Sequence, residues 1–228
     1  MIHELPELRN RTHVFRDRHH AGEVLARMLE GMRLAGVRIL AIPAGGVPVA
    51  AAMAQALGFP LDVAVVSKVT PSWNSEVGYG AVAFDGRVRL DGWKRAGLGV
   101  DEREVQQGID RTVAKVRRRV ESLRQGLGPL VVPGDTVVLV DDGLASGLTM
   151  ATAVEALRDA GAARIIVAVP TGAGSSVKRL AGLADEVCCA NVRTGWSFAV
   201  ADAYETWSDV GDETLLQIMG RHRTSSSR

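Results

Sequence analysis

Cysteine is nearly absent from this 228-residue chain, and its two copies, Cys188 and Cys189, are neighbours. Adjacent strand residues point to opposite faces of a sheet, so this pair cannot bridge two distant segments. The sequence therefore excludes a disulfide-stapled fold, and we expect both thiols to be buried and inert. The five histidines lie far from the cysteines and show no metal-ligand spacing with them, which argues against a structural zinc site.

Long apolar runs are also missing from the chain. No stretch approaches the ~18 consecutive apolar residues that a transmembrane helix requires. The segment Met1–Arg9 is polar and mixed in charge, with neither the basic nor the apolar region of a signal peptide. These features predict a soluble, cytoplasmic protein without a membrane partner.

Neither sign of charge dominates the composition. Lys and Arg number 27 against 26 Asp and Glu, which gives a formal net charge of +1. This balance argues against a broad nucleic-acid-binding face. Basic residues gather at 111–124, but acidic residues of the same predicted helix offset them, so we interpret this run as a solvated helix face rather than an RNA site. A local basic site for a small anion remains open.

Aromatic residues are scarce at 4%, whereas glycine occurs 25 times, a balance typical of α/β folds with tight strand-to-helix turns. Helical and strand apolar periods alternate through most of the chain. This alternation predicts an α/β fold with a doubly wound parallel sheet. The expected strands are residues 37–42, 61–66, 136–140, 164–169 and 186–190. The expected helices include one that contains Leu25–Met32, one that opens at Gly45-Gly46, a charged helix over 101 to about 125, and two that contain Met150–Leu157 and Val177–Ala181.

The length favours a single domain with a small appendage. Residues 70–80 carry turn formers without a period, and we interpret them as a mobile loop leading into a hairpin around Asp85-Gly86. Residues 194–222 lack a further strand–helix unit and end in a short helix, so we expect them to form a C-terminal cap on a core of about 19–193. The tail 223–228 is expected to be flexible.

The segment Val137–Thr149 carries the clearest chemical signal, because a buried strand ends in two carboxylates and a short loop then opens into a helix. The loop N–H groups and the helix N-terminus suit a phosphate, and Ser146 and Thr149 add hydroxyl donors. Asp141 and Asp142 would accept hydrogen bonds from sugar hydroxyls and hold Mg²⁺ through its waters. A ribose 5-phosphate suits both parts of the segment, because its phosphate fits the loop and its hydroxyls fit the acidic pair.

The alternative for this segment is a generic Rossmann-like turn whose Asp, Ser and Thr residues only cap a helix. It is disfavoured because an acidic pair at a strand end is costly without a ligand or metal.

The same segment resembles the phosphoribosyl-pyrophosphate (PRPP) signature of type I phosphoribosyltransferases. That signature combines an apolar run, an acidic pair, a small-residue loop, a Thr and a helix in fixed order. The similarity extends over most of the chain, and together these motifs resemble a bacterial and archaeal branch of the superfamily. The further matching segments are Phe15–Arg18, Ala21-Gly22, Gly45–Ala50, Ser67–Val69, Glu76 and Gly80–Val82.

The resemblance implies transfer of the phosphoribosyl group of PRPP to a nitrogen nucleophile, a nucleobase-like acceptor, with release of pyrophosphate. It implies Mg²⁺ as the cofactor, bound mainly through PRPP. Homodimers are common in the superfamily, so the resemblance allows a second copy of the chain as a partner, and the oligomeric state stays open. The loop at residues 70–80 would be the lid over PRPP, and the C-terminal cap would surround the acceptor.

The resemblance also implies a role for each part of the site. Asp141 and Asp142 would bind the ribose hydroxyls, and Lys68 would neutralise the charge of the pyrophosphate. The alternative for Lys68 is a surface lysine without a role in binding. The pyrophosphate would also be bound by Ala44, Gly45 and Gly46. The 5-phosphate would be bound by Gly143, Leu144, Ala145, Ser146, Gly147, Leu148 and Thr149.

Two departures from the family pattern bear on activity. Ala44 stands where the branch commonly has Arg, which favours as an alternative a non-catalytic PRPP-binding sensor or regulatory module. Ala145 stands where purine-salvage members place an Asp general base, so a purine-salvage mechanism is not supported. No side chain is an obvious base. Glu76 in the lid is the candidate, with a solvated loop carboxylate as its alternative.

The aromatic residues near the C-terminus leave two interpretations open. They could stack on an acceptor base, or they could pack the cap onto the core. These residues are Trp196, Phe198, Tyr204 and Trp207.

Overall fold

The computed structural model describes residues 1–32, 34, 36–75, 77–195 and 197–225. Its central layer is a six-stranded sheet in the order β1-β9-β8-β7-β2-β3, and every neighbouring pair in it is parallel. The predicted parallel sheet is therefore confirmed. Its strands are β1 (Ile2–His3), β2 (Val37–Ala41), β3 (Leu61–Val63), β7 (Thr136–Val140), β8 (Arg164–Ala173) and β9 (Glu186–Arg193).

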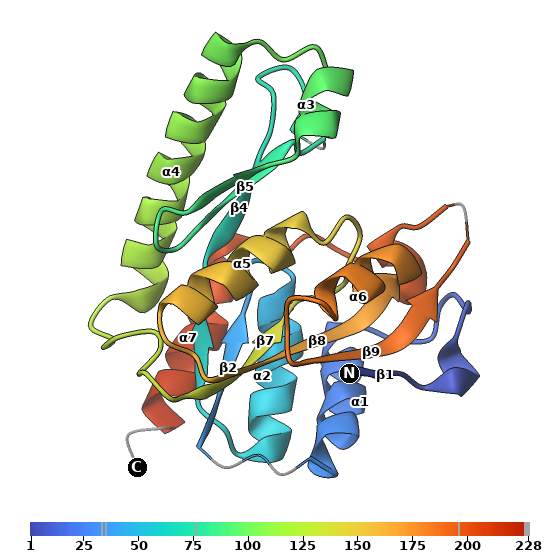
Figure 1. The fold of residues 1–228 in the computed structure, drawn as a ribbon. Helices are drawn as coiled ribbons and strands as arrows, with labels where there is room; N and C mark the ends of the chain where they lie inside the picture. The colour runs from blue at the N-terminus through green and yellow to red at the C-terminus, as the bar shows by residue number, and fades with distance from the viewer. Residues whose placement is uncertain (33, 35, 76, 196, 226–228) are drawn as a thin grey trace.

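Helices cover both faces of this sheet (Figure 1). The helices α1 (Arg18–Glu30) and α2 (Gly46–Leu57) pack on one face, whereas α5 (Leu148–Asp159) and α6 (Gly174–Leu180) pack on the other. Successive strand residues alternate between these two cores. Two separate apolar layers therefore hold the sheet, as the doubly wound pattern requires.

The two cysteines follow this alternation. Cys188 belongs to the core under α1 and α2, and Cys189 belongs to the core under α5 and α6. Both side chains are fully buried, which confirms the expected strand positions. Burial raises the pKa of the Cys188 thiol to about 12, far from the range in which a thiolate forms at neutral pH.

Residues 66–124 form a second unit, which we call the lobe, above the sheet in Figure 1. Its strands make an antiparallel sheet in the order β4-β5-β6, in which β5 and β6 form the predicted hairpin around Asp85-Gly86. The sequence placed the appendage only at the C-terminus. The lobe elements are β4 (Val66–Val69), β5 (Gly80–Ala83), β6 (Val88–Leu90), α3 (Gly92–Gly97) and α4 (Glu102–Arg124).

The prediction that residues 61–66 form one core strand was wrong. The strand β3 ends at Val63, and β4 begins at Val66 in the other sheet. All residues from Asp62 to Ser67 are buried. The hydrophobic run therefore continues across the passage from the sheet to the lobe, and its pattern contains no sign of the break.

The two ends of the chain pack against this framework. β1 extends the sheet beside β9, although the sequence near it shows no sustained period. After β9, the described residues of the C-terminal cap contain a short 3-10 helix, η2 (Val200–Ala203), and the helix α7 (Asp212–Ser225), in agreement with the prediction of no further strand–helix unit. Within the described ranges, no helix combines the length and the apolar character of a membrane span.

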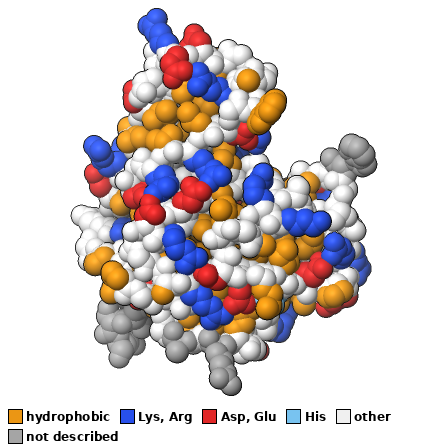
Figure 2. Space-filling view, viewed as in Figure 1, with side chains coloured by type: hydrophobic (Ala, Val, Ile, Leu, Met, Phe, Trp, Pro, Cys, Tyr) orange, Lys and Arg blue, Asp and Glu red, His pale blue; other side chains and the backbone are white. Residues whose placement is uncertain are grey.

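Charged side chains of both signs are interspersed over the face shown in Figure 2, and no large field of one sign covers it. This agrees with the formal net charge of +1. Hydrophobic side chains gather on the lobe in the same view.

A buried ion pair ties the lobe to the sheet. Arg124, the last residue of α4, donates from Nε and Nη2 to the two carboxylate oxygens of Asp62 on β3, at 3.0 and 2.9 Å. The exposed fractions of the two side chains are only 12% and 5%. Asp62 also accepts the N–H of Val63, and Arg124 also donates to the carbonyl of Gly128. The pair therefore fixes the end of α4 against the sheet.

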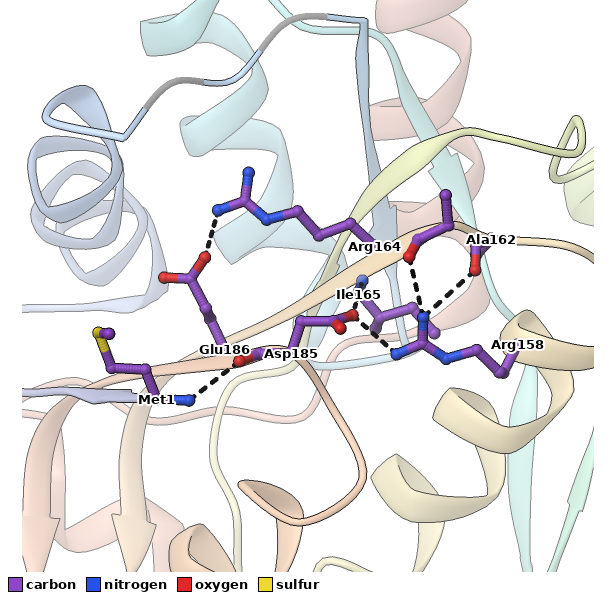
Figure 3. Close-up of polar contacts among 8 residues, drawn as sticks. Met1, Arg158, Ala162, Arg164, Ile165, Asp185 and Glu186 are labelled. Carbon is purple, nitrogen blue, oxygen red and sulfur yellow. Dashed lines mark hydrogen bonds and ion pairs between the residues drawn. The ribbon is translucent and has the colours of Figure 1, made fainter.

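A second polar network joins β8, β9 and α5 at the start of both strands (Figure 3). Asp185 accepts from the Ile165 N–H and from Nη2 of Arg158, both at 2.7 Å. Burial alone would raise the pKa of Asp185, but the Ile165 N–H and the Arg158 guanidinium lower it below its usual range. The ion pair with Arg164 likewise lowers the pKa of Glu186.

Replacing Asp185 by Asn should reduce the acid sensitivity of the fold. Since the folded state lowers the pKa of Asp185, its stabilising effect is present above the unfolded-state pKa and is lost as the pH falls through the folded-state pKa. The free energies of unfolding of Asp185→Asn and wild type, measured with urea between pH 7 and 3, should differ most at pH 7 and converge at low pH. The exposed control Asp209→Asn should follow the wild type, and a constant difference across this range would contradict the assignment.

Asp62→Asn should destabilise the protein because it leaves the Arg124 guanidinium buried without its counter-charge. Losing one partner of a buried pair typically costs about 3–5 kcal/mol of unfolding free energy. Denaturant titration of Asp62→Asn checks this. Glu102→Gln, which removes the exposed pair with Arg95, is the matched control and should cost less than about 1 kcal/mol. Equal effects of the two variants would show that the Asp62 pair does not anchor the lobe.

Candidate functional site

The segment with the clearest chemical signal begins where β7 ends. Asp141 and Asp142 follow the strand directly, a short loop follows them, and α5 begins at Leu148. β7 lies beside β2 at the point where the strand order reverses, and the helices that follow these two strands cover opposite faces. Ligands of open parallel sheets bind at the carboxyl ends of strands at such a switch point.

The loop between Asp142 and α5 has a fixed backbone with unused donors. Gly147 has a φ of 69°, a left-handed conformation that favours glycine. Ser176 donates to the carbonyl of Ala145, and Arg179 donates to the carbonyl of Ser146. Among the described residues, the N–H groups of Ala145, Ser146 and Gly147 have no protein acceptor. Consecutive free N–H groups at the start of a helix form an anion-binding arrangement.

A cavity of about 630 Å³ lies between this loop and the lobe. The sheet side contributes Asp141, Asp142 and the whole loop 143–149, and the C-terminal cap contributes Val200. The lobe side contributes Lys68, Val77, Gly78, Gly80, Lys94, Gly97 and Leu98. The cavity is large enough for a small phosphorylated ligand.

The turn after β2 packs against the acidic pair from the side. A Cβ atom on Gly45 would overlap the carboxylate of Asp142. A Cβ atom on Gly46 would lie 2.7 Å from the carbonyl oxygen of Val140 and 2.9 Å from Cα of Asp141. Only glycine permits this approach at both positions, so the turn and the acidic pair form one packed unit.

Asp142 is held by residues from two other parts of the chain. Its Oδ2 accepts from Nε of Arg18 at 2.9 Å, and its backbone carbonyl accepts from the hydroxyl of Tyr204 at 2.6 Å. The Arg18 guanidinium lies 3.8 Å from the Trp207 ring centroid and donates to the carbonyl of Ser208 at 2.7 Å. Arg18 therefore connects the start of α1, the acidic pair and the C-terminal cap.

The acidic pair is electrostatically costly. Burial raises the pKa of Asp141 well above its usual range, the negative charge of Asp142 raises it further, and Lys68 opposes both effects. Burial also raises the pKa of Asp142, and the Arg18 guanidinium opposes it. The Asp142 N–H donates to the Asp141 carboxylate at 2.9 Å. Two adjacent carboxylates in such surroundings are stabilised by a bound cation or by hydroxyl donors.

The structure brings most predicted site residues to one cavity. Lys68, the acidic pair and all residues of the loop 143–149 line it. The turn of Ala44, Gly45 and Gly46 lies beside the acidic pair but is not among the lining residues that the structure describes. Glu76 lies outside the described residues.

The aromatic residues of the cap separate into different roles. Tyr204 is buried between Phe15 and Trp207, with ring centroids 5.7 and 5.1 Å away, so it packs the cap onto the core. The Arg193 guanidinium lies over the Phe198 ring, 5.5 Å from the ring centroid. Trp196 lies outside the described residues.

Sequence reasoning missed the place of Arg18 and Lys94 in this site. Arg18 stands in one of the segments that carried the family resemblance, but no role was assigned to it. Its contact with Asp142 spans 124 residues of sequence, which no spacing rule reaches. Lys94 gave no signal, because it lies in a short polar helix without a motif.

Comparisons with known proteins match this chain to phosphoribosyl transferases. A family model described as "Phosphoribosyl transferase domain" matches residues 19–203. The protein named "Putative phosphoribosyl transferase" in two strains of Mycobacterium tuberculosis is 36% identical over 212 residues, which cover 92% of this chain and 47% of the relative. This chain thus spans about half the length of those curated relatives.

Solved structures are similar as well. The crystal structure of TT1426 from Thermus thermophilus superposes with a TM-score of 0.72 at 35% identity, over 90% of this chain and 97% of that one. The AQ2163 protein from Aquifex aeolicus has a TM-score of 0.51 at 15% identity, over 95% and 97% of the two chains, which is a likeness of fold alone.

Gly45→Ala should disrupt the site, because the added methyl group would displace the Asp142 carboxylate from Arg18. We expect a loss of about 1–3 kcal/mol in unfolding free energy, the range for overpacking in a tight contact. Gly31→Ala is the matched control, because nothing lies within 4 Å of its Cβ position. Thermal and urea unfolding of both variants check this, and equal stabilities would mean that the turn does not pack on the acidic pair as described.

Proposed function

Because the chain belongs to the phosphoribosyl transferase domain family, we propose that it transfers the phosphoribosyl group of PRPP to a nitrogen nucleophile, a nucleobase-like acceptor, and releases pyrophosphate. The observation that carries this proposal is the cavity in which an acidic pair adjoins a loop of free N–H groups. Hydroxyl acceptors and phosphate donors lie there side by side, as a ribose 5-phosphate requires.

We assign the 5-phosphate to the loop 143–149. The free N–H groups of Ala145, Ser146 and Gly147 are its proposed donors, and the N-terminus of α5 adds a favourable dipole. Ser146 and Thr149, whose hydroxyls can donate to a phosphate, line the same cavity. Since Ser176 and Arg179 hold the carbonyls of the loop, its backbone needs little rearrangement to bind an anion.

We assign the ribose hydroxyls to Asp141 and Asp142, which also fit Mg²⁺ bound through its waters. Mg²⁺ usually takes one or two carboxylates together with substrate phosphates. The described residues contain no group of three or more metal-ligating side chains, so the oxygen donors here suit an ion held mainly by PRPP. When bound, Mg²⁺ would neutralise charge on the leaving pyrophosphate.

The proposed reaction is displacement at the anomeric carbon through a loose, oxocarbenium-like state. Such a state requires positioning and charge neutralisation more than covalent catalysis. The protein groups hold the ribose phosphate at the sheet, and the lobe covers the opposite side of the cavity. Exclusion of water by the loop 70–80 would protect the sugar cation from hydrolysis.

We further propose that residues 1–228 act as one domain, with an acceptor site under the C-terminal cap. Val200 supports this placement, because it lines the cavity next to the acidic pair. A Cβ atom on Gly143 would overlap the Val200 side chain, so the cap approaches the site as closely as glycine allows.

The second candidate function is a PRPP sensor without transferase activity. Ala44 favours it, because this uncharged residue precedes Gly45, which packs on Asp142, and stands where the branch of the family that the chain resembles commonly has Arg. Losing one such contact typically costs a few kcal/mol of transition-state stabilisation.

Two experiments separate the two functions. The first is calorimetric titration with PRPP, with and without Mg²⁺, and the second is a pyrophosphate-release assay with a panel of nitrogen bases. A transferase should bind PRPP with Mg²⁺ and release pyrophosphate with at least one acceptor. Binding without release by any acceptor would support the sensor, and absence of binding to both PRPP and ribose 5-phosphate would overturn both proposals.

Asp141→Asn should weaken PRPP binding by about 10- to 100-fold, the value of a charge-assisted hydrogen bond. We expect the fold to be retained, because Asn can still accept the Asp142 N–H. Circular dichroism and a thermal melt check the fold, and calorimetry checks the affinity. The exposed variant Asp110→Asn serves as the control. An unchanged affinity in Asp141→Asn would remove the ribose role from this residue.

A further inference from the structure

The candidate site is short of positive charge. Among the described residues that line the cavity, the cations are Lys68 and Lys94, and the carboxylates are Asp141 and Asp142. The turn at Ala44 contributes no charge and does not line the cavity. PRPP carries a 5-phosphate at one end and a more highly charged diphosphate at the other. The free N–H groups of residues 145–147 suit the 5-phosphate, but the diphosphate requires further neutralisation.

Lys94 is held in place by its backbone. It lies in α3, whose N-cap residue Asp91 accepts the Lys94 N–H at 3.1 Å. The Asp91 N–H donates to the carbonyl of Tyr79 at 2.7 Å, and Tyr79 is fully buried in the lobe. The start of α3 is thereby fixed to Tyr79, whose two neighbours in sequence, Gly78 and Gly80, both line the cavity.

The ammonium group of Lys94 has no carboxylate partner. In the part of the chain that the structure describes, no ion pair or side-chain hydrogen bond involves it. Its neighbour Arg95 differs, because that guanidinium pairs with Glu102 at the start of α4. The two adjacent cations of α3 therefore serve different purposes, since one stabilises the lobe and the other borders the cavity.

We propose that Lys94, together with Lys68, binds the diphosphate of PRPP from the lobe, in place of the charge that the turn at Ala44 lacks. This inference rests on the proposed function. An ammonium group is a flexible, strongly hydrated point charge that suits a phosphate without fixed geometry. The ligand would then contact the sheet through its 5-phosphate and the lobe through its diphosphate.

Lys94→Ala tests the proposal, with Arg95→Ala as the matched control in the same helix. Calorimetry in the presence of Mg²⁺ measures the affinities for PRPP and for ribose 5-phosphate, which lacks the diphosphate. Lys94→Ala should weaken PRPP binding about 10-fold or more and change ribose 5-phosphate binding less than about 2-fold. Lys94→Arg should retain most of the PRPP affinity, and Arg95→Ala should bind both ligands like the wild type. Thermal melts establish that each variant is folded.

The outcomes separate this inference from the proposed function. If wild type binds PRPP and Lys94→Ala binds it equally well, the role of Lys94 is overturned and the proposed function stands. If Lys94→Ala loses ribose 5-phosphate affinity as strongly as PRPP affinity, Lys94 does not recognise the diphosphate. If wild type binds neither ligand, both the proposed function and this inference fail.

Discussion

The close packing of the turn at Gly45–Gly46 against Asp141 and Asp142 is the contact on which the site depends. The strands β2 and β7 pair in parallel from Val37 and Thr136 to Ala41 and Val140, so both end at the same level. Their following segments emerge side by side, and glycine lets the two backbones touch. This contact removes the acidic pair from water on one side and leaves the other side open to the cavity.

Arg18 offsets the electrostatic cost of burying the acidic pair. A guanidinium against a single carboxylate opposes the effect of burial on the pKa of Asp142, whereas the Asp142 N–H and the charge of Lys68 oppose it at Asp141. The same guanidinium packs on Trp207, a contact that contributes through cation–π attraction and apolar area. The position of the C-terminal cap and the charge of the acidic pair are therefore not independent properties of this fold.

The sequence was informative where a feature is local. The buried run before Asp141 and the small-residue loop after it specify a strand, a turn and a helix within a short segment, and the structure has them in that order. The break between Val63 and Val66 could not be predicted, because burial continues through both sheets. The contacts of Arg18 and the position of Lys94 depend on tertiary packing between distant segments, which no periodicity encodes.

The adjacent cysteines have a use that follows from their placement. Each thiol is buried in a different apolar layer, Cys188 in the one beneath α1 and α2 and Cys189 in the one beneath α5 and α6. A thiol reagent can reach either one only when its own layer opens. In variants with one cysteine replaced at a time, the rate of alkylation of the remaining thiol would measure how often its side of the sheet is exposed. The two thiols therefore allow the opening of the two cores to be measured separately.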